Sequence, residues 1–302
     1  QVSPDGRWVA GVGNDPRLFL WKTDSFLREH YAVSARARVI ATPAAADGRF
    51  VALLSADGVE VVDAARLTLF GRLSLARPIR ALALSADGRA AAILDDADEL
   101  VVWALAVGDR LRTLDMSDET CPSGHLAADP KGPRFALVCH DGPILWIDPA
   151  APTPVTRLGD VVGFSPTVVI PELRALVVGD ARGTLRVSDG PGAPLRTIGD
   201  YPGAIRALLA LPGAPEFIVT SEEIVERRGL DRPTHRYPGH RLQVGYVALS
   251  PDQKWLITIG RDNTVRVFDR ATAALRVELY SSDLLASVAA MSPDGVKLAV
   301  GV

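Results

Sequence analysis

Apolar residues along the chain come in short runs of about the length of a β-strand, and many of these runs alternate with polar residues. The clearest series is Trp255–Ile259, then Thr264–Phe268, then the more polar run Leu275–Leu279. Gly, Asp, Asn and Pro bound such runs, and no segment keeps a helical period over a useful length. The pattern therefore predicts an all-β protein.

One turn recurs throughout the chain, with a small residue, then Pro or Ala, then Asp and Gly. Its clear copies contain Asp5, Asp47, Asp87, Asp252 and Asp294, and weaker copies lie at 129–132, 170–172 and 211–213. Pro presets φ for a turn, and Asp and Gly accept the remaining turn geometry. Asp5, Asp47 and Asp87 are spaced by 42 and 40 residues, Asp252 and Asp294 by 42, and the 165 residues from Asp87 to Asp252 correspond to four repeats. This spacing is close to the period of a propeller blade.

Each repeat predicts four short strands, the outermost of them half solvated. A single four-stranded sheet cannot bury both faces, so the sheets must stack in a ring that leaves only short protected edges. We therefore expect one β-propeller over residues 1–302, with seven four-stranded blades, or eight. The predicted second strands lie near Trp8, Phe50, Ala91, Phe135, Ala175, Phe217, Leu256 and Leu298, and a third strand follows seven of them.

Both ends of the chain read as the interior of a repeat, since Gln1 enters a turn and Val302 ends an apolar strand. This predicts a slice of a longer multidomain polypeptide.

The last full unit resembles the WD-repeat family. The residues that carry the resemblance are Gly239, His240, Val244, Val247, Ser250, Pro251, Asp252, Thr258, Asp262, Phe268 and Asp269. The resemblance implies a structural tetrad of His, Ser or Thr, Asp and Trp within a blade. His240, Thr258 and Asp262 match three of its places, and Phe268, which has no indole N–H, stands in the Trp place. Asp15 and Trp21 in the first unit keep the same spacing.

The charge and cysteine content bound the partners and the compartment. Net charge is −3, so no strongly basic field exists to draw in nucleic acid or an anionic membrane. No apolar run has the roughly 18 residues of a membrane helix. Cys121 and Cys139 could approach each other on adjacent strands, but we expect two unpaired, mostly buried thiols in a reducing compartment. With the Ala- and Arg-rich composition, this suggests a bacterial, cytoplasmic protein.

Catalytic and metal-binding motifs are missing from the sequence, and we expect no catalytic residue, metal or cofactor. His235 and His240 are five residues apart, but His240 is the tetrad histidine and His235 falls on an outer strand. The acidic run 95–99 could attract calcium. It is better explained by a tetrad carboxylate at Asp96 or Asp98, with the others solvated.

Five arginines are the candidate partner-binding residues, on the face that the family resemblance assigns to partners around the central channel. They are Arg38, Arg80, Arg206, Arg241 and Arg261. Arg often anchors interfaces and acidic groups, so this rim could bind an acidic or phosphorylated segment. In the competing interpretation, these arginines pair with nearby aspartates and only solubilise the face.

The resemblance implies a non-catalytic protein-interaction module, acting as the docking or sensor part of a larger protein. Two alternatives stay open because fold does not fix function. One is a metal-dependent propeller enzyme of the lactonase or hydrolase type. The other is the sensor half of an oligomeric signalling or defence ATPase.

Overall fold

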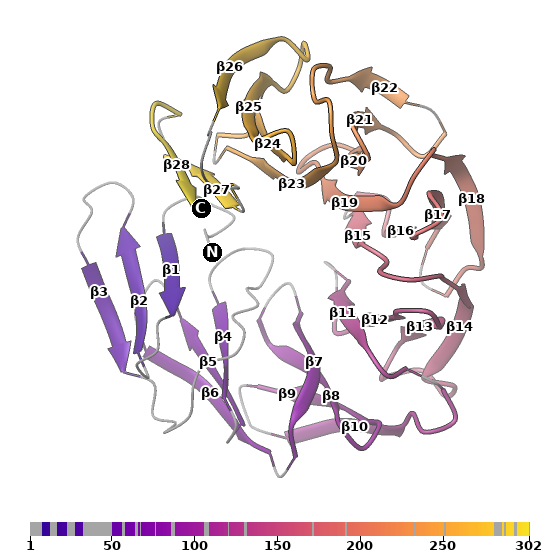
Figure 1. Cartoon of the computed structure of the whole chain (residues 1–302). Helices are drawn as coiled ribbons and strands as arrows, with labels where there is room; N and C mark the ends of the chain where they lie inside the picture. Colours follow the sequence, from indigo (N-terminus) through magenta and orange to yellow (C-terminus); the bar gives the residue numbers. More distant parts are fainter. Residues whose placement is uncertain are drawn as a thin grey trace. The chain divides into compact units, whose positions relative to one another are not determined.

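A computed structural model describes the strands of the chain. The described residues are 8–12, 17–22, 28–32 and 50–301, except 56–57, 64–65, 67, 76, 86–87, 106–108, 120, 130–131, 171, 191, 232, 251, 281–285, 287 and 293–294. All the regular structure in this part of the chain is β-strand (Figure 1). The all-β prediction is confirmed.

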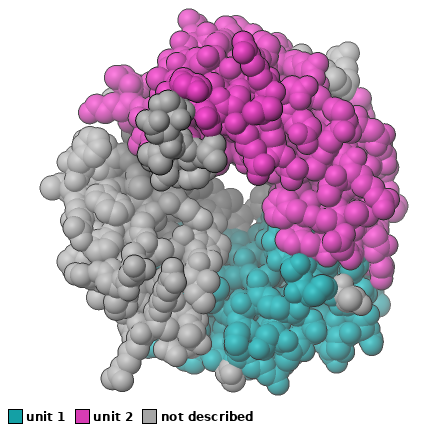
Figure 2. Space-filling view, viewed as in Figure 1, with its two compact units in different colours: residues 1–139, 143–156 teal, residues 140–142, 157–302 magenta. Residues whose placement is uncertain are grey.

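The chain divides into two compact units, coloured separately in Figure 2. The first comprises residues 1–139 and 143–156, and the second comprises 140–142 and 157–302. Among the described residues, no helix is long and apolar enough to cross a membrane.

The first unit contains antiparallel sheets whose strands follow one another in chain order. They are β1 (Trp8–Val12), β2 (Arg17–Lys22) and β3 (Arg28–Ala32); β4 (Phe50–Ser55), β5 (Gly58–Asp63) and β6 (Thr68–Ser74); β7 (Ile79–Leu84), β8 (Ala90–Asp95), β9 (Glu99–Ala104) and β10 (Asp109–Asp115); and β11 (Gly124–Ala128), β12 (Phe135–Cys139) and β13 (Pro143–Ile147). The last of these sheets is completed by β14 (Val155–Asp160), which runs from the first unit into the second.

The second unit repeats the arrangement. Its sheets are β15 (Thr167–Ile170), β16 (Ala175–Gly179), β17 (Thr184–Ser188) and β18 (Leu195–Asp200); β19 (Ile205–Ala210), β20 (Phe217–Ser221), β21 (Ile224–Arg228) and β22 (Pro233–Arg236); β23 (Val244–Leu249), β24 (Trp255–Gly260), β25 (Thr264–Asp269) and β26 (Leu275–Tyr280); and β27 (Val288–Met291) with β28 (Leu298–Gly301). A strand lies at each of the eight predicted second-strand positions, and seven of the eight are followed by a third strand.

Alternation along the inner strands explains how neighbouring sheets pack. In β8, Ala91 and Ile93 belong to the core shared with β4 and β5, whereas Ala92 and Leu94 belong to the core shared with β12 and β13. Successive residues of a strand point to opposite faces, so an inner strand is apolar on both sides when sheets cover both. The outermost strand β26 is exposed along its whole length.

The recurring turn is explained by its first and last residues. In the last full repeat, the Ser250 hydroxyl oxygen accepts a hydrogen bond of 2.9 Å from the Trp255 amide, and the Gln253 amide donates to the Ser250 carbonyl at 2.8 Å. Gly88 and Gly295 occupy the Gln253 place in other repeats, with φ of 67° and 70°. This left-handed backbone explains why the sequence favours Gly there.

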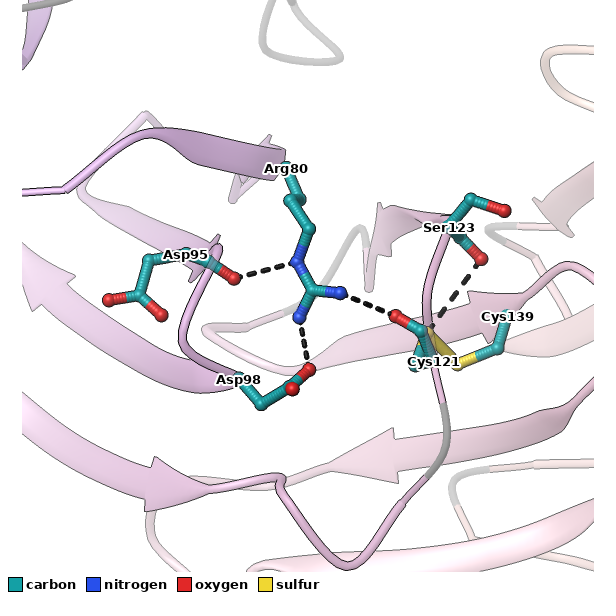
Figure 3. The surroundings of a disulfide bond; sticks show 6 residues. All are labelled: Arg80, Asp95, Asp98, Cys121, Ser123 and Cys139. Carbon is teal, nitrogen blue, oxygen red and sulfur yellow. Dashed lines mark hydrogen bonds and ion pairs between the residues drawn. A yellow bond between two sulfur atoms is a disulfide. The ribbon is translucent and has the colours of Figure 1, made fainter.

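The expectation of two free thiols is wrong, because Cys121 and Cys139 form a disulfide (Figure 3). Cys121 lies in the loop before β11, and Cys139 is the last residue of β12. Antiparallel pairing of β11 with β12 puts Gly124 opposite Cys139, which brings the loop back to the strand end. The disulfide therefore joins the loop before β11 to the end of β12.

Replacing both cysteines by alanine is expected to lower the free energy of unfolding by about 2–4 kcal/mol, because the unfolded chain loses a cross-link. Chemical denaturation of the oxidised wild type and of the double variant measures the difference. A reductant is expected to destabilise the wild type and to leave the variant unchanged. Equal stability of the two proteins under oxidising conditions would contradict a structural role for the bond.

Candidate functional site

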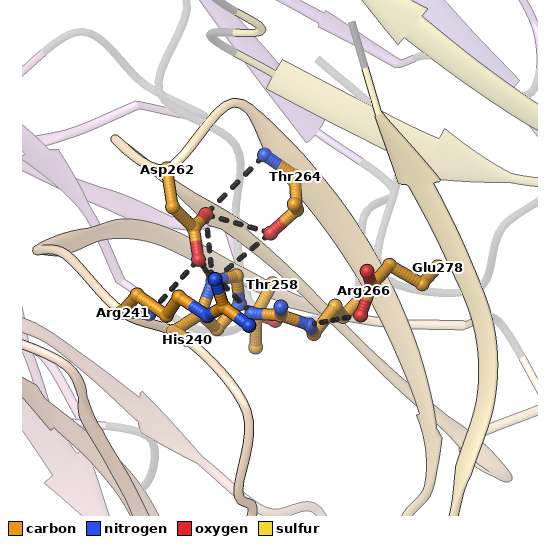
Figure 4. Close-up of polar contacts among 7 residues, drawn as sticks. All are labelled: His240, Arg241, Thr258, Asp262, Thr264, Arg266 and Glu278. Carbon is orange, nitrogen blue, oxygen red and sulfur yellow. Dashed lines mark hydrogen bonds and ion pairs between the residues drawn. The ribbon is translucent and has the colours of Figure 1, made fainter.

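The structure brings His240, Thr258 and Asp262 together within the β23–β26 sheet (Figure 4). His240 lies in the loop before β23, Thr258 is in the middle of β24, and Asp262 is in the turn before β25. His240 Nδ1 is 3.1 Å from Asp262 Oδ1, and its Nε2 is 2.7 Å from Thr258 Oγ1. The imidazole therefore joins the loop to the second strand and to the following turn.

Burial and the neighbouring groups set the protonation of this network. Burial lowers the pKa of His240, and the hydrogen bond to Asp262 offsets this only in part. Burial alone would raise the pKa of Asp262, but hydrogen bonds from Thr264, the Arg241 amide and His240 hold it well below its usual range. An ionised carboxylate only accepts, so the neutral imidazole donates from Nδ1 and accepts the Thr258 hydroxyl at Nε2.

Two further residues extend the network, and the sequence analysis did not identify them. Arg266 is almost fully buried, and its guanidinium lies 3.1 Å from Asp262 Oδ2 and 2.9 Å from Glu278 Oε2. It pairs with Thr258 across β24 and β25. The sequence signal was an arginine in the middle of an otherwise apolar third strand, where burial requires a partner.

Phe268 does not join these hydrogen bonds. It is fully buried and packs edge-on against Tyr237, with ring centroids 5.4 Å apart. The Tyr237 hydroxyl donates to the Arg270 carbonyl at 2.8 Å. In the first unit, Asp15 lies outside the described residues, and only the backbone of Trp21, in β2, is described.

Another buried arginine stabilises the β19–β22 sheet and was also missed. Arg228 donates to the Tyr201 hydroxyl at 3.0 Å and to the Ile198 carbonyl at 2.7 Å. The Tyr201 hydroxyl in turn donates to Glu226 at 2.9 Å. Burial raises the pKa of Tyr201 to about 12, although the Arg228 guanidinium opposes that rise.

Arg80 is occupied by contacts within the first unit (Figure 3). Its guanidinium donates to the carbonyls of Asp95 and Cys121, each at 2.7 Å, and also to the Asp98 carboxylate. Arg80 is therefore a structural residue that joins the β7–β10 sheet to the disulfide loop. For Arg80, the competing interpretation therefore holds: this arginine pairs with a nearby aspartate, Asp98.

Three of the other candidate arginines lie in the second unit. Arg206, Arg241 and Arg261 are exposed, and none forms an ion pair within the described part of the chain. The Arg261 amide donates to the Gln243 carbonyl at 2.8 Å, which places Arg261 and the loop containing Arg241 at one end of the sheet. Arg38 lies outside the described residues.

In the acidic run 95–99, neither Asp96 nor Asp98 has the role that Asp262 has in the hydrogen-bonded network. Asp95 closes this turn, since its Oδ1 accepts the amides of Ala97 at 3.0 Å and Glu99 at 2.8 Å. Asp98 pairs with Arg80. The described residues contain no group of three or more His, Cys, Asp or Glu side chains arranged to hold a metal ion.

Comparisons with known proteins agree with this architecture. Residues 231–269 match the WD40 family model, described as WD domain, G-beta repeat. A search of curated proteins gives no match.

Three solved structures are similar over most of the chain. The C-terminal WD40 domain of Sif2 has 15% identity and a TM-score of 0.73, with 97% of this chain and 89% of that chain covered. The computationally designed Ika8 protein has 17% identity and a TM-score of 0.72, with 97% and 92% covered. The β-propeller domain of Cps50 (Swd1) from Myceliophteria thermophila has 17% identity and a TM-score of 0.59, with 87% and 93% covered.

The stacked antiparallel sheets and these structural matches define a β-propeller. Within this fold, residues 231–269 form a unit that is similar to the WD40 repeat.

Replacing Thr258 by Val is expected to lower the free energy of unfolding by about 1–3 kcal/mol, because a near-isosteric change leaves the buried His240 Nε2 without its donor. Urea denaturation measures the loss. Thr197→Val, on exposed β18, is the control and is expected to change stability by less than about 0.5 kcal/mol. Equal effects of the two substitutions would show that the hydroxyl contributes nothing specific.

Stability is expected to fall as the pH drops below about 7. The folded pKa of His240 is below the ordinary value of about 6.5, so the unfolded chain takes up the proton first and is favoured as the pH falls. A further loss of stability is expected below about pH 4.5. There Asp262 takes up a proton in the unfolded chain before it does so in the folded protein, because folding lowers its pKa.

Unfolding in urea at pH 7.5, 6.5 and 5.5 measures the histidine contribution. His240→Gln is expected to show a shallower pH dependence than the wild type, and His235→Gln, on exposed β22, is expected to match the wild type. A His240→Gln protein with the wild-type slope would rule out this assignment.

Proposed function

We propose that this propeller is a non-catalytic docking module that binds an acidic segment of a protein partner through Arg206, Arg241 and Arg261. In this proposal it serves as the docking or sensor part of a longer, multidomain polypeptide. The observation that carries the proposal is that these three guanidinium groups are exposed and have no carboxylate partner within the described residues.

The three arginines belong to neighbouring sheets of one unit. Arg206 is the second residue of β19, and β19 contacts β23, which follows the loop containing Arg241. A guanidinium that is not used within the fold is free to form paired hydrogen bonds with a carboxylate or phosphate. Arg is also among the residues that contribute most to binding at interfaces.

The surface around these arginines is not uniformly basic. Glu222 and Glu223 form the turn between β20 and β21, and the Glu222 carbonyl accepts the Val244 amide at 2.8 Å. The whole chain carries a net charge of −3. Recognition in this proposal therefore depends on direct contacts of each guanidinium with the partner, because long-range attraction is weak at this net charge.

The test uses an array of acidic and phosphorylated peptides, with basic peptides of equal length on the same array. Binding is expected on acidic peptides, and replacing Arg206, Arg241 and Arg261 together by Ala is expected to weaken it at least about tenfold. Arg112→Ala on exposed β10 is the control, since Arg112 forms no ion pair in the described chain. A wild type without preference for acidic peptides, or a triple variant that binds equally well, would overturn the proposal.

A further inference from the structure

A cavity of about 290 Å³ lies beside the β7–β10 sheet and is also lined by Ser74 at the end of β6. It is next to the residues equivalent to the hydrogen-bonded network of the β23–β26 sheet. The strand registers establish the equivalence. Ile93 pairs with Val101 across β8 and β9, as Thr258 pairs with Arg266 across β24 and β25. The following turns also agree, since Asp98 and Asn263 share a left-handed backbone with φ of 62° and 59°.

Apolar residues replace the polar network in the β7–β10 sheet. Ile93 stands in the Thr258 place and Val101 in the Arg266 place. The Asp96 amide donates to the Pro78 carbonyl, as the Arg261 amide donates to the Gln243 carbonyl, so Pro78 is equivalent to Gln243. His240 lies three residues before Gln243, and Leu75 lies three residues before Pro78, so Leu75 stands in the His240 place. Apolar side chains therefore stand at the places of the imidazole and the guanidinium, and the cavity lies beside them.

Trp103 also lacks a polar contact on this side of the sheet. It stands in the Phe268 place and lines the cavity, and its buried Nε1 has no hydrogen-bond partner within the described residues.

Carboxylates remain beside the cavity although the strand's own arginine is gone. Asp95 and Glu99 both line it. In the second unit, equivalent third-strand arginines pair with carboxylates of their own sheets. Arg266 lies 3.1 Å from Asp262, and Arg186 lies 3.2 Å from Asp180.

Among the described residues, Arg77 is the one cation that forms ion pairs with the two cavity carboxylates. Its guanidinium is 3.4 Å from Asp95 and 3.6 Å from Glu99, and its side chain is half exposed. Arg110, the other arginine of the lining, lies over the Trp103 ring at 4.9 Å.

We propose that this cavity binds a guanidinium cation from outside the chain, in the place that Arg266 fills within the β23–β26 sheet. The cation pairs with Asp95 and Glu99 in exchange for Arg77, and the alkyl chain attached to it packs against Leu75, Ile93 and Val101. Two sources share this chemistry, an arginine side chain of another protein and a small guanidino compound. The cavity lies at the small end of the roughly 300–1,000 Å³ of known ligand sites, which suits one such group. This inference does not rest on the proposed function, whose arginines lie in the other unit.

Titration with agmatine tests the proposal, with the indole N–H signal of Trp103 in the nitrogen–proton NMR spectrum as the reporter. Trp103→Phe assigns the signal. We expect a saturable shift with a dissociation constant of about 1 mM or lower, as for a small ligand with few contacts. No saturable shift of this signal, or saturation by glutarate but not by agmatine, would overturn the proposal.

Variants separate the guanidinium site from a nonspecific effect. Asp95→Asn with Glu99→Gln is expected to weaken agmatine binding at least about tenfold, whereas Asp109→Asn, on exposed β10, leaves it unchanged. Arg77→Ala is expected to tighten binding, because it removes the competing cation, and an anion site would show the opposite change. Val101→Arg is expected to abolish binding, because the new side chain fills the cavity, and to raise the melting temperature. Failure of Val101→Arg to fold leaves the other variants decisive.

N-acetyl-arginine amide distinguishes the two sources. Binding within a few-fold of agmatine supports an arginine residue of another protein as the ligand. Binding at least about tenfold weaker than agmatine supports a small guanidino compound. If the Asp95→Asn, Glu99→Gln protein binds each probe as tightly as the wild type does, a site of either kind is contradicted.

Discussion

The structure depends on the need to cover both faces of every inner strand. A four-stranded antiparallel sheet with apolar residues on both sides is stable only between two neighbours. In β8, alternate residues serve the cores on the two sides, and in β24 Leu256 packs with Phe268 and Tyr237 while Ile257 and Ile259 pack with β27. Hydrophobic burial of this kind sets no precise position for the loops at the strand ends, so polar or covalent contacts must fix them.

The sheets use different chemistry to fix the loop that precedes each first strand. The β23–β26 sheet uses the imidazole of His240 between Thr258 and Asp262. The sheet that begins at β11 uses the disulfide between Cys121 and Cys139, which also joins the loop to the end of the second strand. The hydrogen bonds of His240 and the disulfide both join the loop before the first strand to the second strand of the sheet. A repeat that lacks the tetrad residues can therefore still hold this loop in place.

In the β7–β10 sheet, three places of the network are apolar, and the loop before β7 is instead joined to the sheet by Arg77, which pairs with Asp95 and Glu99. Leu75, Ile93 and Val101 replace the polar residues, and the cavity beside Asp95 and Glu99 lies next to them. In the second unit, Arg206, Arg241 and Arg261 are exposed and form no ion pair among the described residues.

The sequence alone determined the repeat, the all-β class and the positions of the second and third strands. These follow from local alternation and from a turn whose Ser and Gly have local roles. It also indicated His240, Thr258 and Asp262, because these match a family pattern at fixed spacing. Only the tertiary structure decided that Cys121 and Cys139 pair, that Arg80 is occupied by Asp98 and two carbonyls, and that Arg266 and Glu278 complete the network. These contacts join residues that are far apart in the sequence, so local patterns do not predict them. They depend on which side of a strand faces which neighbouring sheet.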